Sequence, residues 1–119
     1  MIKFSNIPVS DDHKPFVIAE AGINHEGDFG KAIELVDIAI ESGASAVKFQ
    51  THITDKEMIP TDMTPGNISK EKLWDIIDRC VLTESQEKEL FDYSKENGIL
   101  FFSTPFSREG ADRLNNLGV

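Results

Sequence analysis

Two short apolar runs of the chain carry residues that could bind or chemically change a small molecule. The first run, residues 16–19, leads directly into the carboxylate of Glu20. The second, residues 46–50, contains the ammonium group of Lys48 and the amide of Gln50 two positions later. Side chains alternate between the two faces of a strand, so Lys48 and Gln50 are expected on one face and their apolar neighbours on the other. A carboxylate, an ammonium and an amide on one face could support proton transfer and anion binding.

A third apolar run, residues 99–103, ends in two hydroxyl groups. Ser103 and Thr104 come just before Pro105. In parallel α/β folds the carboxyl ends of the strands meet at one edge, which is where ligands bind. We therefore expect these hydroxyls to join Glu20 and Lys48 there. A lysine beside hydroxyls and backbone donors suits a phosphate or a carboxylate, so the sequence predicts an anionic substrate.

Each of these residues also has an interpretation that involves no catalysis. Glu20 and Lys48 could form a buried ion pair between neighbouring strands, and Gln50 could satisfy nearby backbone groups. Ser103 and Thr104 could be turn or cap residues, a common role for such side chains before a helix. The residue types alone leave these alternatives open.

Several other polar or reactive side chains are expected to be structural. His25 is interpreted as an exposed or capping residue of a loop, and His13 and His52 lack the spacing of metal ligands. Cys80 falls in a helical pattern and is expected to be a core thiol, while Trp74 is expected in core or lid packing. A charge cluster is interpreted as a solvated helix face; it contains Glu84, Glu87, Lys88 and Glu89.

The elements that must position these residues alternate between strands and helices. The three apolar runs are predicted to be parallel strands, with residues 1–15 as an irregular or β-like lead-in. Residues 52–69 form a long polar segment of the kind that serves as a lid or binding loop. Four helices are predicted from apolar spacing, caps and terminal glycines: one from the cap Asp28 to Gly43, one from Lys70, one from the capping box of Thr83 and Gln86 to Gly98, and one over residues 108–117.

This repeat predicts an α/β fold of about three strand-helix units. A closed (β/α)8 TIM barrel needs about 250 residues, and a doubly wound domain of flavodoxin type has five strands, whereas three are readable here. We therefore interpret residues 1–119 as the amino-terminal part of a larger barrel domain.

Composition limits the possible partners. The chain has 119 residues, is 39% hydrophobic and carries a formal charge of −9, which argues against binding nucleic acid or anionic membranes. Its start is too polar for a signal peptide, and no run approaches the roughly 20 apolar residues of a membrane span. A single cysteine cannot form an internal disulfide, so a reducing, cytoplasmic setting is expected.

Five motifs, in this order, resemble the amino-terminal part of bacterial sialic acid synthases: AEAGINHEGD, AVKFQTHIT, PGN at residues 65–67, DRC at residues 78–80 and FFSTPFS at residues 101–107. Enzymes of this family condense phosphoenolpyruvate with N-acetylmannosamine to give N-acetylneuraminate and phosphate. The resemblance implies an eight-stranded catalytic barrel, followed by an antifreeze-like domain that is not found in these residues, and a homodimer at full length. It covers the chain from about residue 16 onward.

The resemblance also implies roles for individual residues. Glu20 would sit at the reacting centre and orient or deprotonate a substrate, and Lys48 would bind phosphoenolpyruvate. The remaining contacts would come from Thr104 with Ser103 or Ser107 to the phosphate or carboxylate, and from Gln50 and Asn67 to the sugar. A divalent metal, usually manganese, would activate the sugar aldehyde through histidines on later strands, so no metal ligand is predicted in this chain.

Two alternatives to this function stay open. Legionaminic and pseudaminic acid synthases share most of these motifs, although the PGN element favours the sialic acid enzyme. A chain of another class would be an acidic α/β domain that binds a partner or phosphate without catalysis. Residues 1–119 alone are expected to be inactive and poorly stable.

Overall fold

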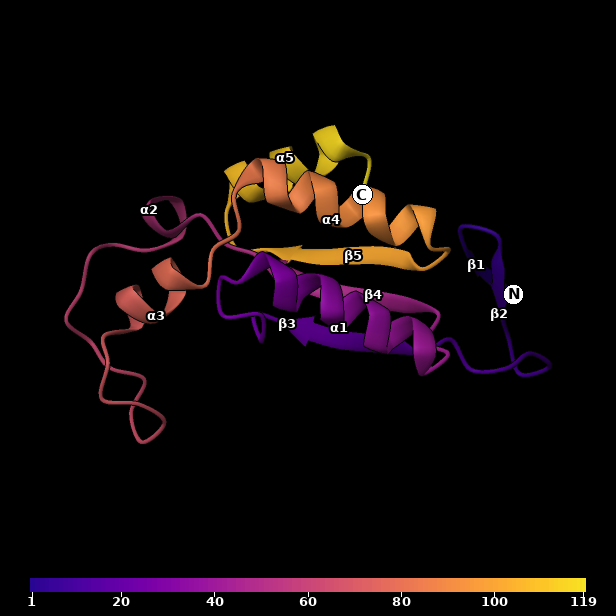
Figure 1. The fold of residues 1–119 in the computed structure, drawn as a ribbon, viewed down its shortest axis with the longest axis horizontal. Helices are drawn as coiled ribbons and strands as arrows, with labels where there is room; N and C mark the ends of the chain where they lie inside the picture. Colours follow the sequence, from indigo (N-terminus) through magenta and orange to yellow (C-terminus); the bar gives the residue numbers. More distant parts are fainter.

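The computed structural model describes all 119 residues, and three parallel strands lie at its centre (Figure 1). Their order is β3-β4-β5, with both neighbouring pairs parallel. The strands are β3 (Ile18–Gly22), β4 (Ala46–Thr51) and β5 (Leu100–Pro105). The prediction of an α/β fold with a parallel sheet is confirmed, while closure of such strands into a barrel stays a prediction.

Three helices follow the strands, and their caps explain where they begin. They are α1 (Phe29–Glu41), α4 (Glu84–Glu96) and α5 (Arg108–Leu117). The Asp28 carboxylate accepts a hydrogen bond from the backbone N–H of Lys31 at the start of α1, and Thr83 forms the predicted capping box of α4. Gly118 ends α5 in the left-handed region, with φ of 89°, a conformation that glycine adopts without strain. These helix predictions are confirmed.

The hydrophobic core lies between the sheet and α1 and α4. Val47, Phe49 and Phe101 point from the strands into it, and the rings of Phe49 and Phe101 stack with centroids 5.7 Å apart. Val36 and Leu90 are almost completely buried on the helix side. Burial of these apolar side chains is the main force that holds the helices on the sheet.

The opposite side of the sheet has no helix on it. We call it the open face; it carries Ile18, Glu20, Lys48, Gln50, Phe102 and Thr104. Ile18 is 44% exposed on this face, so β3 is covered on one side only. The apolar run in β3 is typical of a strand with cover on both sides, but here only one side is covered.

The lead-in forms a hairpin at the amino ends of the central strands (Figure 1). Antiparallel strands β1 (Ile2–Phe4) and β2 (Ile7–Val9) pair with each other and not with the central sheet. The Phe4 ring lies 4.9 Å from that of Phe16 and 6.2 Å from that of Phe102. This aromatic contact attaches the hairpin to the amino end of the open face.

Two strand boundaries differ from the sequence predictions. β3 begins at Ile18 and continues past Glu20, because its pairing with β4 shifts between Glu20 and Gly22. β5 continues to Pro105, two residues beyond the predicted end at residue 103, so Thr104 also lies within the strand. The shift in β3 is an irregularity of the strand pairing next to Glu20.

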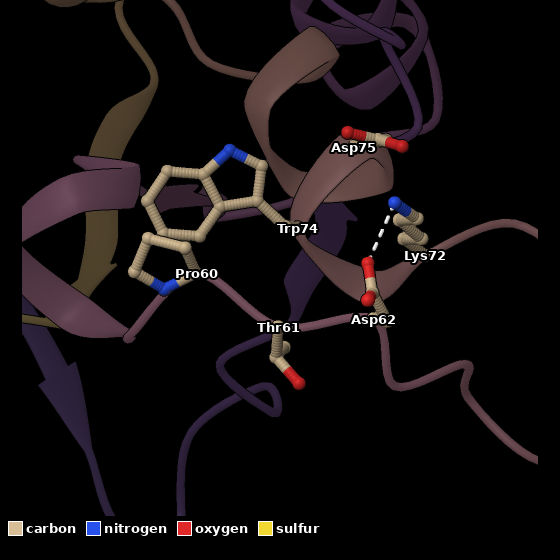
Figure 2. Close-up of a pocket in the computed structure, with 6 residues that line it drawn as sticks. All are labelled: Pro60, Thr61, Asp62, Lys72, Trp74 and Asp75. Atoms are coloured by element: carbon tan, nitrogen blue, oxygen red, sulfur yellow. Dashed lines mark ion pairs between the residues drawn. The ribbon is translucent and has the colours of Figure 1, made fainter.

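The long segment after β4 contains a short helix that the sequence did not predict, α2 (Thr54–Glu57), before α3 (Leu73–Arg79). It extends beyond the carboxyl ends of the strands (Figure 1). An ion pair of 2.6 Å joins Asp62 to Lys72, and Trp74 lies beside Pro60 in the lining of a hollow of about 380 Å³ (Figure 2). These contacts join residues 60–62 to the start of α3.

Cys80, at the end of α3, is buried as predicted, and burial raises the pKa of its thiol. None of the helices combines the length and the apolar character needed to cross a membrane.

Candidate functional site

Glu20 and Lys48 face each other across the β3-β4 pair. They are register partners, and the Lys48 Nζ lies 2.8 Å from Glu20 Oε2 on the open face. The side chains are 51% and 36% exposed, so the ion pair considered from the sequence exists but is not buried. Water screens such a pair, and its contribution to stability is about 1 kcal/mol or less. An entering anion can therefore compete for the ammonium group at small cost.

Gln50 and Thr104 form the next pair along the same face. They are register partners in β4 and β5, beyond Lys48 toward the carboxyl ends. A Cβ atom placed at Gly22 would lie 3.7 Å from Gln50 Nε2 and 3.7 Å from Glu20 Oε1. Gly22 has a φ of 57°, which favours glycine. A glycine without side chain thus leaves room between the carboxylate and the amide.

Ser103 points away from this group. Its Oγ lies 2.6 Å from Thr51 Oγ1, and Thr51 donates to Glu87 Oε2 at 2.6 Å on the helix side of the sheet. The expectation that Ser103 and Thr104 converge on one site is wrong, because adjacent residues of a strand point to opposite faces. The alternation of side chains along a strand would have predicted this from the sequence if both hydroxyls had been assigned to the strand.

Glu87 is a buried residue, and its assignment to a solvated helix face is wrong. It is 3% exposed, and its Oε1 lies 3.1 Å from Arg113 Nε without the angle of a hydrogen bond. Burial raises the pKa of the Glu87 carboxyl, while the hydrogen bond from Thr51 and the charge of Arg113 oppose that shift. The cluster connects β4, α4 and α5 and lies on the helix side of the sheet.

His25 is also buried, with 1% exposure, so of its two interpretations the exposed loop residue is wrong, whereas a capping role within the loop agrees with its backbone contact. Its Nδ1 accepts a hydrogen bond of 3.0 Å from the backbone N–H of Gly27, and its ring centroid lies 6.1 Å from that of Phe49. Burial, with a smaller contribution from His52, lowers the pKa of His25. The residue closes the turn after β3 and belongs to the core.

His52 connects the open face to α2 in a way that the sequence analysis missed. Its Nε2 lies 2.9 Å from Gln50 Oε1, and its Nδ1 lies 2.6 Å from Glu57 Oε1. The ring stacks on Phe106, with centroids 4.2 Å apart. His52 follows Gln50 by two positions, just after the last residue of β4, but nothing in the polar segment marks Glu57 as buried.

The two remaining predicted site residues lie away from the paired side chains. Asn67 is exposed in the long loop, and Ser107 caps α5 by accepting a hydrogen bond of 3.0 Å from the N–H of Gly110. Neither side chain forms a hydrogen bond or an ion pair with Gln50 or Lys48. The binding roles of Asn67, Ser103, Thr104 and Ser107 stay predictions.

The residues of this chain do not fit a metal site. No group of three or more histidine, cysteine, aspartate or glutamate side chains is arranged to hold an ion. Both ring nitrogens of His52 contact other side chains, and Nδ1 of His25 accepts from the backbone.

Comparison with known proteins places this sheet and its polar residues in a family. The sequence model of the NeuB family matches residues 35–119, which is most of the chain. The chain belongs to the NeuB family. Recognition of the sialic acid synthase family from the five motifs is thereby confirmed.

Relatives within the NeuB family make several sialic-type acids. The N,N'-diacetyllegionaminic acid synthase of Campylobacter jejuni is 37% identical over 89% of this chain and 33% of its own length. The spore coat polysaccharide biosynthesis protein SpsE of Bacillus subtilis is 37% identical over 96% of the chain and 31% of its own length. The chain thus spans about a third of the curated relatives it matches.

A solved structure of the same kind matches nearly the whole fold. The N-acetylneuraminic acid synthetase of Leptospira borgpetersenii, in complex with citrate, superposes with a TM-score of 0.80 and is 29% identical. The match covers 99% of this chain and 38% of that protein. The parallel α/β arrangement of this NeuB chain is therefore that of a region of a sialic acid synthetase.

Proposed function

We propose that the full-length protein condenses phosphoenolpyruvate with N-acetylmannosamine to give N-acetylneuraminate and phosphate. By full-length protein we mean a polypeptide of the relatives' length that includes these 119 residues. The observation that carries the proposal is the pairing of Glu20 with Lys48 and of Gln50 with Thr104 along one face of a NeuB-family sheet.

Lys48 would bind the anionic groups of phosphoenolpyruvate. Its side chain is 36% exposed on the open face and its ammonium is held by one carboxylate, so a phosphate can approach it from the solvent side. Thr104, exposed near the carboxyl end of β5, would donate its hydroxyl to the same ligand. Charge-assisted contacts of this kind offset the negative charge that accumulates as phosphate leaves.

Glu20 and Gln50 would hold the acceptor sugar. The reaction forms a bond between carbon 3 of the enol and the aldehyde carbon, water adds at carbon 2, and phosphate leaves from the resulting tetrahedral intermediate. Glu20 lies where it can orient the aldehyde or accept a proton, and the space above Gly22 gives the sugar access to both side chains. Holding both substrates in one orientation is a large part of such catalysis.

The oligomeric state, location and metal of the full-length protein are also proposals. We propose a cytoplasmic homodimer, with the TIM barrel completed by segments other than residues 1–119. A divalent metal such as manganese would have to be held by side chains outside this chain, and the roles above involve no step through it.

A second candidate is the synthesis of N,N'-diacetyllegionaminic acid from the corresponding diacetamido sugar. It is favoured by the identity of 37% to the Campylobacter enzyme and of 38% to a Legionella pneumophila enzyme of the same name. The open face would serve both sugars, because the roles given to Glu20 and Gln50 involve the aldehyde and an acceptor oxygen, which both sugars have.

The experiment that tests this proposal incubates the full-length protein and manganese with phosphoenolpyruvate and either sugar. Phosphate release and the mass of the product are followed together. We expect stoichiometric phosphate and a nine-carbon acid from N-acetylmannosamine. Product from the diacetamido sugar alone would select the second candidate, and no product from either sugar would contradict both.

A further inference from the structure

The side chain of Gln50 contacts the buried ring of His52, which in turn contacts the buried carboxyl group of Glu57. The His52 and Glu57 side chains are 4% and 7% exposed, whereas Gln50 reaches the open face. A second bond fixes Glu57 itself, since its Oε2 accepts from the backbone N–H of Ile53 at 3.2 Å. With Phe106 stacked on the ring, His52 has contacts at both nitrogens and on one face. Such an arrangement leaves little freedom to the ring.

The contacts of His52 define which way the Gln50 amide points. The ring Nδ1 lies 2.6 Å from Glu57 Oε1, so Glu57 holds one side of the ring. On the other side Nε2 lies 2.9 Å from Gln50 Oε1, so the carbonyl end of the amide faces the ring. The NH2 group of Gln50 lies toward Gly22, on the side of the Glu20 carboxylate, where a donor is favoured.

We propose that Glu57 and His52 are a positioning pair, which keeps the carbonyl oxygen of Gln50 turned toward the ring and its NH2 group turned toward the open face. There the NH2 group donates to an acceptor oxygen of the sugar substrate. This inference rests on the proposed function, because it assigns the sugar to Gln50. It makes α2, a helix that touches no substrate, a determinant of sugar affinity.

The test uses the full-length protein with the Glu57→Gln substitution, which keeps the size of the side chain and removes its charge. We expect the KM for the sugar to rise roughly tenfold, the effect of a misoriented hydrogen bond, with the KM for phosphoenolpyruvate unchanged. The matched control is Asp55→Asn on the same helix, whose carboxylate is exposed and 3.8 Å from Lys56. It should change neither constant.

A double-mutant cycle separates positioning from general support of the fold. If Glu57 acts through Gln50, then Glu57→Gln should have no further effect on the sugar KM once Gln50→Ala is present. An equal rise in both backgrounds, or an equal loss of affinity for both substrates, would overturn the proposal.

A measurement that does not use Glu57→Gln covers the case in which that variant does not fold. In protein labelled with ¹⁵N histidine, Gln50→Ala should shift the signal of His52 Nε2, which faces the amide, and leave that of Nδ1, which faces Glu57, unchanged. An unchanged Nε2 signal would overturn the contact between the ring and the amide. This readout needs no turnover, so its failure is distinct from a failure to convert phosphoenolpyruvate and sugar, which would contradict the proposed function.

Discussion

Lys48 has one partner on the open face, and that partner is exchangeable. In the structure its ammonium contacts Glu20 at 2.8 Å, and both side chains are partly in water. We predict that Lys48→Ala in the full-length protein raises the KM for phosphoenolpyruvate by at least tenfold, because a charge-assisted contact to an anion is lost. The KM for the sugar should change little. Steady-state kinetics with each substrate varied in turn provide the measurement.

The comparison variant for this prediction is Asn67→Ala in the exposed loop. It should raise the KM for the sugar and leave that for phosphoenolpyruvate unchanged. Equal effects of Lys48→Ala on the two constants would contradict the assignment of Lys48 to the anion.

His25 gives the stability of the protein a specific dependence on pH. Its pKa in the folded state is lowered by burial, so as pH falls the unfolded chain binds a proton before the folded one does. The contribution of His25 is therefore complete above its ordinary pKa of about 6.5 and is lost as pH falls below it. His25→Asn, which can still accept from the N–H of Gly27, should make the free energy of unfolding less dependent on pH below that value.

Urea denaturation at several pH values, in parent and variant, measures this effect. The comparison is needed because Glu87 acts in the opposite direction. Its raised pKa means that the folded state holds a proton that the unfolded chain releases, so its contribution weakens as pH rises above its ordinary value. Identical pH profiles for parent and His25→Asn would disprove the role of His25.

At the scale of elements, α4 and α5 are joined to the sheet through one buried charge cluster. Glu87 of α4 approaches Arg113 of α5 and accepts from Thr51 of β4. We predict that Arg113→Met destabilises the full-length protein by about 3 kcal/mol, because it leaves a buried carboxylate without its counter-charge. Adding Glu87→Gln should recover part of that loss. Chemical denaturation of the single and double variants decides, and a double variant less stable than Arg113→Met would contradict the pairing.

Sequence patterns predicted the helices and strands well where the pattern, such as a cap or an alternation, lies within a single element. Asp28, Thr83 and Gly118 mark helix ends that the structure reproduces, and alternation in β4 correctly separated Lys48 and Gln50 from their apolar neighbours. The errors concern relations between elements. Burial of Glu87 depends on which side of α4 meets the sheet, a property that spacing in one polar segment does not contain.

The candidate site was predictable to the same extent. The pairing of Glu20 with Lys48 followed from strand order, whereas the contact of His52 with Glu57 depends on α2, a helix of four residues with no periodic signal. The hydroxyls of β5 were wrongly expected on one face, because Ser103 and Thr104 are adjacent residues of one strand and their side chains point to opposite faces.

For the whole molecule, the exposed open face has a cost for the isolated chain. Ile18 and part of the Phe4, Phe16 and Phe102 cluster border water, and the outer edges of β3 and β5 have no partner strand. We predict that residues 1–119 alone are inactive and melt without a sharp transition, because unpaired edges and apolar surface favour association over a single folded state.

The measurement combines phosphate release, with manganese and both substrates present, and a thermal melt followed by circular dichroism. A cooperative melt from a monomer, or turnover within an order of magnitude of the full-length protein, would show that these residues hold a complete core and site.

The position of Trp74 determines which part of this chain tryptophan fluorescence monitors. It is the single tryptophan, and it lies beside Pro60 in the loop region and not between the sheet and its helices (Figure 2). Tyr93, the single tyrosine, donates a hydrogen bond of 2.6 Å to Asp37 and so joins α4 to α1. Indole emission from residues 1–119 therefore follows the loop, whereas phenol absorbance follows the packing of the two helices. The two chromophores would register loop movement and loss of the helical layer as separate events.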